Sequence, residues 1–209
     1  MAQKPISFKH YGILIILLWL VLASRLLAPA PDTRLTDIDS AGYDLLAINL
    51  LNGHGFSLNS ESPYCPDPLR TPVYPMFLAS IYQVFGRTFA LVFLMQAMLE
   101  VITACVMYRL AHYLSPERAH LTGLLALCAY LLSLSQWHYA NLLLTESLLT
   151  CLLGLFIWFY VLAQQTPKPQ YAILCGVFLG LAILCKPNYQ WLILILPLAF
   201  LIKRQSWRS

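Results

Sequence analysis

The sequence predicts an all-α protein that crosses a membrane about six times, as a single module over residues 1–209. Hydrophobic residues make up 59% of the chain and charged residues only 11%, against roughly 25% charged in an ordinary soluble domain. Long apolar runs recur along the chain, each near the roughly 17–25 residues that a helix needs to cross hydrocarbon. These runs lie near 11–28, 88–111, 119–135, 142–163, 171–185 and 188–202.

The first apolar run, 11–28, has some features of a signal sequence. Lys4 and Lys9 precede it, and "APA" at 28–30 is typical of a cleavage site. Pro31 follows directly and argues against cleavage, and the run is long for a cleaved signal. We therefore expect a retained signal anchor.

The distribution of positive charge predicts the orientation, because Lys and Arg prefer cytoplasmic loops. With the N-terminus in the cytoplasm, most basic residues of the six-helix path fall on that side. They are Lys4, Lys9, Arg109, Arg118, Lys168, Lys203, Arg204 and Arg208. The outer face of a multi-pass protein of the inner or plasma membrane then carries 29–87, 136–141 and 186–188. The basic residues that break this rule are Arg25, Arg34, Arg70, Arg87 and Lys186.

The outer loop 29–87 predicts two further helices at the membrane interface. In "TDIDSAGYDLLAINLLNG", Thr36 is a candidate N-cap with Asp39 three residues later, and Asn-Gly at 52–53 is a stop signal. Apolar residues cover most of this helix, which predicts an interfacial position. The narrow polar strip that remains consists of Asp37, Ser40 and Asp44.

The rest of the loop contains an irregular stretch and the second interfacial helix. Residues 53–71 are rich in Gly, Ser and Pro, which is typical of irregular structure. Helical spacing resumes in "TPVYPMFLASIYQVFG", with Pro72 near its start and Gly86 at its end. The loop therefore has room for a site at the boundary between lipid and water.

Cysteine spacing and charge narrow the range of cofactors and partners. Most cysteines lie inside predicted spans, where a free Cys behaves as a small hydrophobic residue. Cys65 is outside, and Cys185 is its sole plausible disulfide partner, a pairing that we do not favour. The sequence has no CxxC motif or His/Cys cluster, so no metal site is predicted, although a divalent cation stays open. A basic patch interleaved with aromatics is also missing, so no nucleic acid partner is expected.

Candidate functional residues collect at the predicted outer ends of the helices. Ionisable groups there are costly to bury, so each is a functional hypothesis. The candidates are Asp37, Asp39, Tyr43, Arg70, Tyr74, His138, Glu146 and Lys186.

Each candidate also has a purely structural interpretation. The aspartates could stabilise the start of a helix through its dipole. Arg70 and Lys186 could extend their charges from apolar surroundings into water, and His138 fits an aromatic belt. Glu146 could pair with Lys186 or an outer arginine to avoid an isolated charge.

Four stretches together carry a resemblance to a known family. They are "DSAGYDLLAINLLNGHGFS", "RTPVYPMFLASIYQVFG", "LLLTESLLTCLLGLFIWFYVLA" and "GVFLGLAILCKP". In this order they resemble the N-terminal half of the GT-C type membrane glycosyltransferases. More narrowly, they are similar to the dolichyl-phosphate-mannose protein mannosyltransferase-like group, which includes the aminoarabinose lipid A transferases. Relatives commonly continue into more spans and a soluble region, so we expect a fragment, a truncated reading frame or half of a split enzyme.

The resemblance implies an activity and assigns roles to residues. Family members transfer a sugar from a polyprenyl-phosphate donor to a lipid, glycan or protein acceptor on the extracytoplasmic face. By this resemblance Asp39 is the catalytic base, and Arg70 and Lys186 bind the donor phosphate. The role of Glu146 stays open between site organisation and acceptor contact. The other supporting residues are Asp37, Tyr43, Tyr74 and His138.

General chemistry agrees with an inverting transfer, because a single base suffices when the leaving group is already a phosphate. Two other function classes compete with this interpretation. The chain could be a non-catalytic membrane subunit that binds a polyprenyl-phosphate lipid or assists a partner enzyme. A transporter ranks last, because its spans would usually be broken near mid-membrane.

Overall fold

The computed structural model describes residues 37–131, 133, 142–166 and 168–193, together with Gly12, Ile15, Trp19 and Ala23. Within these residues every named element is a helix, and the isolated bridge between Ser57 and Pro66 is the only strand-like pairing. The all-α prediction is confirmed for this part of the chain. Most of the predicted first span, the 136–141 connection and most of the predicted sixth span lie outside the described residues.

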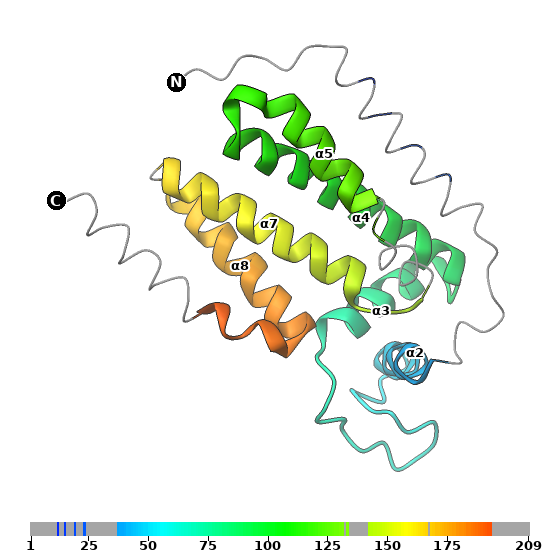
Figure 1. Ribbon diagram of the computed structural model, residues 1–209. Helices are drawn as coiled ribbons and strands as arrows, with labels where there is room; N and C mark the ends of the chain where they lie inside the picture. Colours follow the sequence, from blue (N-terminus) through cyan, green and yellow to red (C-terminus); the bar gives the residue numbers. More distant parts are fainter. Residues whose placement is uncertain are drawn as a thin grey trace.

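Four helices form the body of the structure. They are α4 (Phe89–Leu114), α5 (Ala119–Leu131), α7 (Glu146–Gln165) and α8 (Pro169–Cys185). α4 packs against α5 and α7, and α7 packs against α8 (Figure 1). A short connection that contains the helix η1 (Pro116–Arg118) joins α4 to α5, and another short connection joins α7 to α8. Because both connections are short, the helices of each pair are antiparallel.

These helices occupy the predicted positions of the second to fifth spans. By length and composition, α4 and α7 are apolar enough to cross a membrane. α5 and α8 are apolar but shorter within the described residues. The antiparallel arrangement brings the start of α7 and the end of α8 to one end of the bundle, where α2 (Ile38–Leu51) and α3 (Val73–Phe85) also lie (Figure 1).

Helix α2 begins one residue later than predicted. Its N-cap is Asp37 rather than Thr36, and the Asp37 carboxylate accepts a hydrogen bond from the Ser40 amide at 3.1 Å. The backbone of Asp37 is extended, which lets its short side chain reach the amide three residues on. At the other end Gly53 has a φ of 75°, so the predicted stop is confirmed.

Two of the three residues in the polar strip of α2 face the protein, whereas Asp37 is exposed. Ser40 and Asp44 are buried, whereas the apolar Ile38 is 83% exposed. The Asp44 carboxylate accepts hydrogen bonds from the Tyr82 hydroxyl at 2.8 Å and from Arg87 Nε and Nη2 at 3.1 and 2.6 Å. This contact joins α2 to α3. It also gives a structural reason for Arg87, one of the basic residues that break the predicted charge distribution. Burial, followed by the Asp44 charge, raises the pKa of the Tyr82 hydroxyl far above its usual range.

The loop between α2 and α3 folds back onto α2. The Asn49 side-chain amide donates to the carbonyls of Ser57 at 2.7 Å and Asn59 at 2.9 Å. Further on, the Asp67 amide donates to the Phe56 carbonyl at 2.8 Å. These bonds return the chain to the start of α3 and place the residues just before α3 beside α2.

The main hydrophobic core lies at the same end of the bundle. It combines buried side chains from α2, α3, α4, α7 and α8, including Ala47, Leu78, Val92, Leu152 and Ala182. α3 contributes most heavily, with Tyr74, Leu78 and Tyr82 nearly inaccessible to solvent. The described part of the 29–87 segment is therefore packed onto the helix ends rather than extended away from them.

We expect Asp44→Asn to destabilise the fold, because the amide removes the charge that Arg87 and Tyr82 share. Arg87 is half exposed and can be rehydrated, so the loss in free energy of unfolding should be about 2 kcal/mol. That corresponds to a melting temperature roughly 4–8 °C lower for a chain of this size. Thermal unfolding in detergent measures it, with the exposed Glu117→Gln as control. A variant that melts with the wild type would show that this ion pair does not hold α2.

Candidate active site

Two pairs of oppositely charged side chains lie at the end of the bundle where α2 and α3 pack. Asp39 Oδ1 is 3.1 Å from Arg70 Nη2, and Glu146 Oε1 is 3.1 Å from Lys186 Nζ. Asp39 is in the first turn of α2, and Glu146 is the first residue of α7. Arg70 lies in the loop before α3, and Lys186 directly follows α8. Four candidate site residues from separate parts of the chain thus form two ion pairs.

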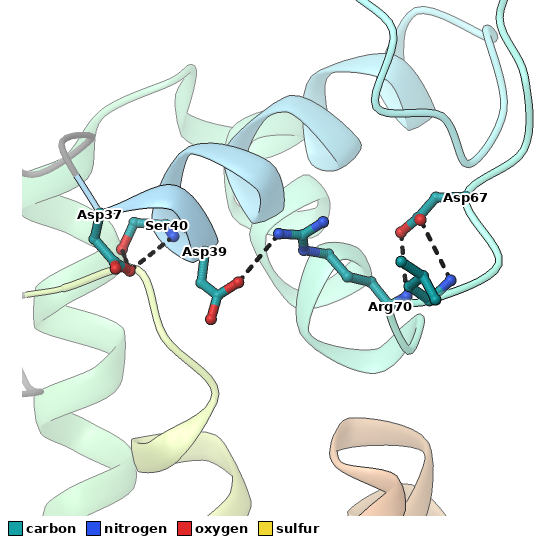
Figure 2. A network of polar contacts seen from close by, with 6 residues as sticks. Asp37, Asp39, Ser40, Asp67 and Arg70 are labelled. Carbon is teal, nitrogen blue, oxygen red and sulfur yellow. Dashed lines mark hydrogen bonds and ion pairs between the residues drawn. The ribbon is translucent and has the colours of Figure 1, made fainter.

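Arg70 is held both at its backbone and at its guanidinium group. Its backbone amide donates to the Asp67 carboxylate at 3.1 Å, and its guanidinium reaches Asp39 across the face of α2 (Figure 2). The helix has a glycine where the guanidinium lies: a Cβ on Gly42 would be 2.7 Å from Arg70 Cζ. Only the absence of a side chain at Gly42 permits this close approach.

The Asp39–Arg70 pair is unequally exposed. The Arg70 side chain is 17% exposed and that of Asp39 is 65% exposed. The carboxylate is therefore open to a second molecule, while the cation is fixed by its surroundings. An exposed carboxylate supported by a constrained guanidinium can accept a proton while an anion is held beside it.

Two tyrosines continue the contact from Arg70 into the core. Arg70 Cζ is 5.6 Å from the centroid of the Tyr43 ring, within cation–π range. The Tyr43 ring meets the Tyr74 ring edge-on at 5.1 Å, and the Tyr74 hydroxyl donates to Gln96 Oε1 at 2.7 Å. Burial raises the pKa of Tyr43 to about 12, with the Asp39 charge adding to the effect. Tyr43 is accordingly neutral at physiological pH.

The second pair sits between the start of α7 and the end of α8. Pro187 ends α8, because it has no amide hydrogen to continue the helix. The Thr145 hydroxyl donates to Glu146 Oε2 at 3.3 Å, whereas Lys186 contacts Oε1. The pairing of Glu146 with Lys186, given above as its structural alternative, is thus present. Both side chains are partly exposed, so the pair itself adds little stability.

The remaining predicted residues have different outcomes. The Asp37 carboxylate turns back to Ser40 and caps α2 (Figure 2), which is its structural alternative. His138 lies outside the described residues. Cys65 and Cys185 are both free thiols. In the part of the chain that the structure describes, no group of three or more His, Cys, Asp or Glu could hold a metal ion.

Sequence reasoning missed several polar residues near the site. Gln96 and Glu100 are buried in α4, and the Ser147 hydroxyl donates to Glu100 Oε1 at 3.2 Å. The signal was available, because a glutamate inside an apolar run is costly and needs a partner. Thr71 was also missed: its hydroxyl donates to the Cys185 carbonyl at 2.8 Å. Nothing local in the sequence points to that contact.

Comparison with protein families matches residues 68–209 to the family described as dolichyl-phosphate-mannose-protein mannosyltransferase. The matched part includes Arg70, Glu146 and Lys186, whereas Asp39 precedes it. Neither the curated proteins nor the solved structures give a significant match. The family match covers more than half of the chain and agrees with the apolar helices. The chain therefore belongs to the dolichyl-phosphate-mannose-protein mannosyltransferase family, whose members are membrane glycosyltransferases of the GT-C type.

Proposed function

We propose that this chain carries the active site of an inverting glycosyltransferase that uses a polyprenyl-phosphate-linked sugar as donor. The acceptor is a hydroxyl or amine of a lipid, glycan or protein on the extracytoplasmic face of the membrane. The observation that carries the proposal is the contact between the exposed Asp39 carboxylate and the constrained Arg70 guanidinium. This contact supports the proposal because it brings a carboxylate suited to act as a base next to a cation suited to bind phosphate, at one end of a bundle of apolar helices.

In this proposal the bundle crosses the membrane and the α2–α3 end faces outward. Six spans and a cytoplasmic N-terminus give the orientation expected from the positive charges. A stripe of exposed apolar side chains on α8 leads toward Lys186 and offers a surface for lipid or for the prenyl tail. Its members are Ile173, Val177, Leu181 and Leu184.

Each charged residue has one task in the transfer. The acceptor oxygen or nitrogen attacks the anomeric carbon and forms the new bond, while Asp39 takes its proton. The bond from that carbon to the phosphate oxygen breaks, and the oxygen leaves with the electron pair. Arg70 and Lys186 stabilise the charge that develops on the phosphate. A single displacement inverts the configuration at the anomeric carbon.

The Asp39–Arg70 pair also leads us to propose the order of donor binding and proton removal. Without donor, Asp39 and Arg70 neutralise one another at 3.1 Å. A phosphate ester competes with the carboxylate for the guanidinium, because guanidinium binds both groups in a bidentate manner. When Arg70 turns to the phosphate, Asp39 loses its partner and becomes available as a base. Donor binding therefore precedes removal of the acceptor proton.

We expect Asp39→Asn to abolish transfer while the protein still binds donor. Loss of a general base should lower the turnover rate by about 10²–10⁴-fold. Affinity for polyprenyl phosphate should be equal or higher, because the carboxylate no longer competes for Arg70. Transfer and binding assays on the same membranes measure both, with the exposed Glu61→Gln as control. Full activity in Asp39→Asn would refute the base assignment. A wild-type protein that binds polyprenyl phosphate but transfers no sugar would favour a non-catalytic lipid-binding subunit.

The close approach at Gly42 provides a test that separates function from stability. Gly42→Ala should keep or raise the melting temperature, since Ala favours a helix over Gly. The new methyl group displaces the Arg70 guanidinium, so the KM for donor should rise about tenfold, the loss expected for one charge-assisted hydrogen bond. Gly176→Ala is the matched control, because a Cβ there meets open space. An unchanged KM in Gly42→Ala would argue against phosphate binding by Arg70.

Thiol labelling tests the orientation. Cys65 is exposed, whereas the other cysteines are buried or partly buried. A membrane-impermeant maleimide should label intact cells or spheroplasts through Cys65, and Cys65→Ser should remove the signal. Labelling that requires permeabilised membranes would place the loop in the cytoplasm and overturn the proposed topology.

A further inference from the structure

The two proposed phosphate-binding cations are joined through their neighbours in sequence. Thr71 directly follows Arg70, and Cys185 directly precedes Lys186. The Thr71 hydroxyl donates to the Cys185 carbonyl at 2.8 Å, across 114 positions of the chain. This hydrogen bond therefore connects the start of α3 to the end of α8 at the point where each presents a positive charge.

The accepting carbonyl is one that α8 does not satisfy. In a continuing helix, the Cys185 carbonyl would accept from the amide of residue 189. That amide, on Tyr189, donates instead to the Lys186 carbonyl at 3.3 Å. Cys185 is 1% exposed, so water has little access to the group. The Thr71 hydroxyl takes the place of the missing amide.

Both ends of this link are stiff. Thr71 is β-branched and precedes Pro72, which restricts both its side chain and its backbone. On the other side, Pro187 limits the backbone of Lys186 in the same way. A single hydrogen bond between two restricted segments can fix a separation that a bond between flexible loops could not.

Tyr43 is influenced by the acidic member of each charge pair. Tyr43 lies under the Arg70 guanidinium. Burial makes the largest contribution to the raised pKa of Tyr43, and the Asp39 charge makes the next. The Glu146 charge also raises this pKa. The Glu146–Lys186 pair is therefore close enough to influence the residue on which Arg70 rests. One phosphate group could contact both cations only if their spacing were maintained.

We propose that Thr71 is a positioning residue that sets the spacing of Arg70 and Lys186 so that both cations contact one donor phosphate. This inference rests on the proposed function and adds a residue to it. Thr71 itself touches neither sugar nor phosphate. It acts by holding the end of α8 against the start of α3, since displacements of about 1 Å at a binding group can cost a hundredfold in rate.

The test compares Thr71→Val, which keeps the shape and removes the hydroxyl, with Thr71→Ser, which keeps the hydroxyl. The full chain in detergent micelles is titrated with a polyprenyl phosphate of defined length and with the corresponding polyprenol. Thr122→Val is the matched control, because the Thr122 hydroxyl also donates to a carbonyl, that of Arg118, at 3.1 Å. Melting temperatures are recorded for every variant.

We expect Thr71→Val to bind polyprenyl phosphate about tenfold more weakly, the change expected from losing one good phosphate contact. Binding of polyprenol should be unchanged, and Thr71→Ser and Thr122→Val should stay within about twofold of the wild type. In an Arg70→Ala background, Thr71→Val should cause no comparable further loss, because the pair of cations is already broken.

Three results would overturn the inference. They are wild-type phosphate binding by Thr71→Val, an equal loss for polyprenol, and a Thr71→Ser variant as weak as Thr71→Val. In each case a wild-type preference for polyprenyl phosphate over polyprenol would leave the proposed function standing. If the wild type itself shows no such preference, the proposed function and the role of Thr71 both fail.

Discussion

The packing of α2 and α3 onto the end of the bundle depends on the contacts of the buried Asp44 carboxylate. A charge removed from water must be paired and hydrogen-bonded, and Asp44 satisfies this requirement through Tyr82 and Arg87 at the far end of α3. That requirement fixes α2 on the bundle. Asp39, just over one helical turn earlier, can then stay exposed without losing its position. One helix thus carries a buried structural acid and an exposed acid, which is the proposed base.

The positions of the helices could be predicted because apolar runs and capping residues are local signals. The gathering of Asp39, Arg70, Glu146 and Lys186 at one end followed from alternating helix direction. Their pairing did not, because it depends on contacts between distant segments. Thr36 and Asp37 are adjacent residues of types that can both cap a helix, so the sequence favours Thr36 as a candidate N-cap and only the backbone of Asp37 shows which residue does so.

Some features of the site had no sequence signal at all. A helix that is apolar around most of its surface does not reveal which face meets the protein, so the inward direction of Asp44 was missed. Nothing in the sequence distinguishes Gly42 from other helical glycines, and its role follows only from the Arg70 guanidinium that lies against it. The Thr71 hydroxyl gains importance only because Pro187 ends α8. In each of these cases, the meaning of a residue comes from a partner far away in the chain.

The family match and the geometry support different parts of the site. The matched residues contain both cations and Glu146, whereas the proposed base comes from the segment before them. The assignment of Asp39 as the proposed base therefore rests on its contact with Arg70 and on the resemblance of the stretch "DSAGYDLLAINLLNGHGFS". The buried Glu100 stabilises the start of α7 through Ser147, next to the residue that pairs with Lys186.

The lengths of α7 and α8 determine where Lys186 lies relative to Glu146. Glu146 begins one helix and Lys186 follows the end of the next, so their meeting depends on the number of residues between them. Each helical residue adds about 1.5 Å of rise and about 100° of rotation. One residue gained or lost in either helix would turn the ammonium group away from the glutamate, even if the apolar packing were repaired. The lengths of these two helices are thus constrained by the charges at their ends as well as by their apolar packing.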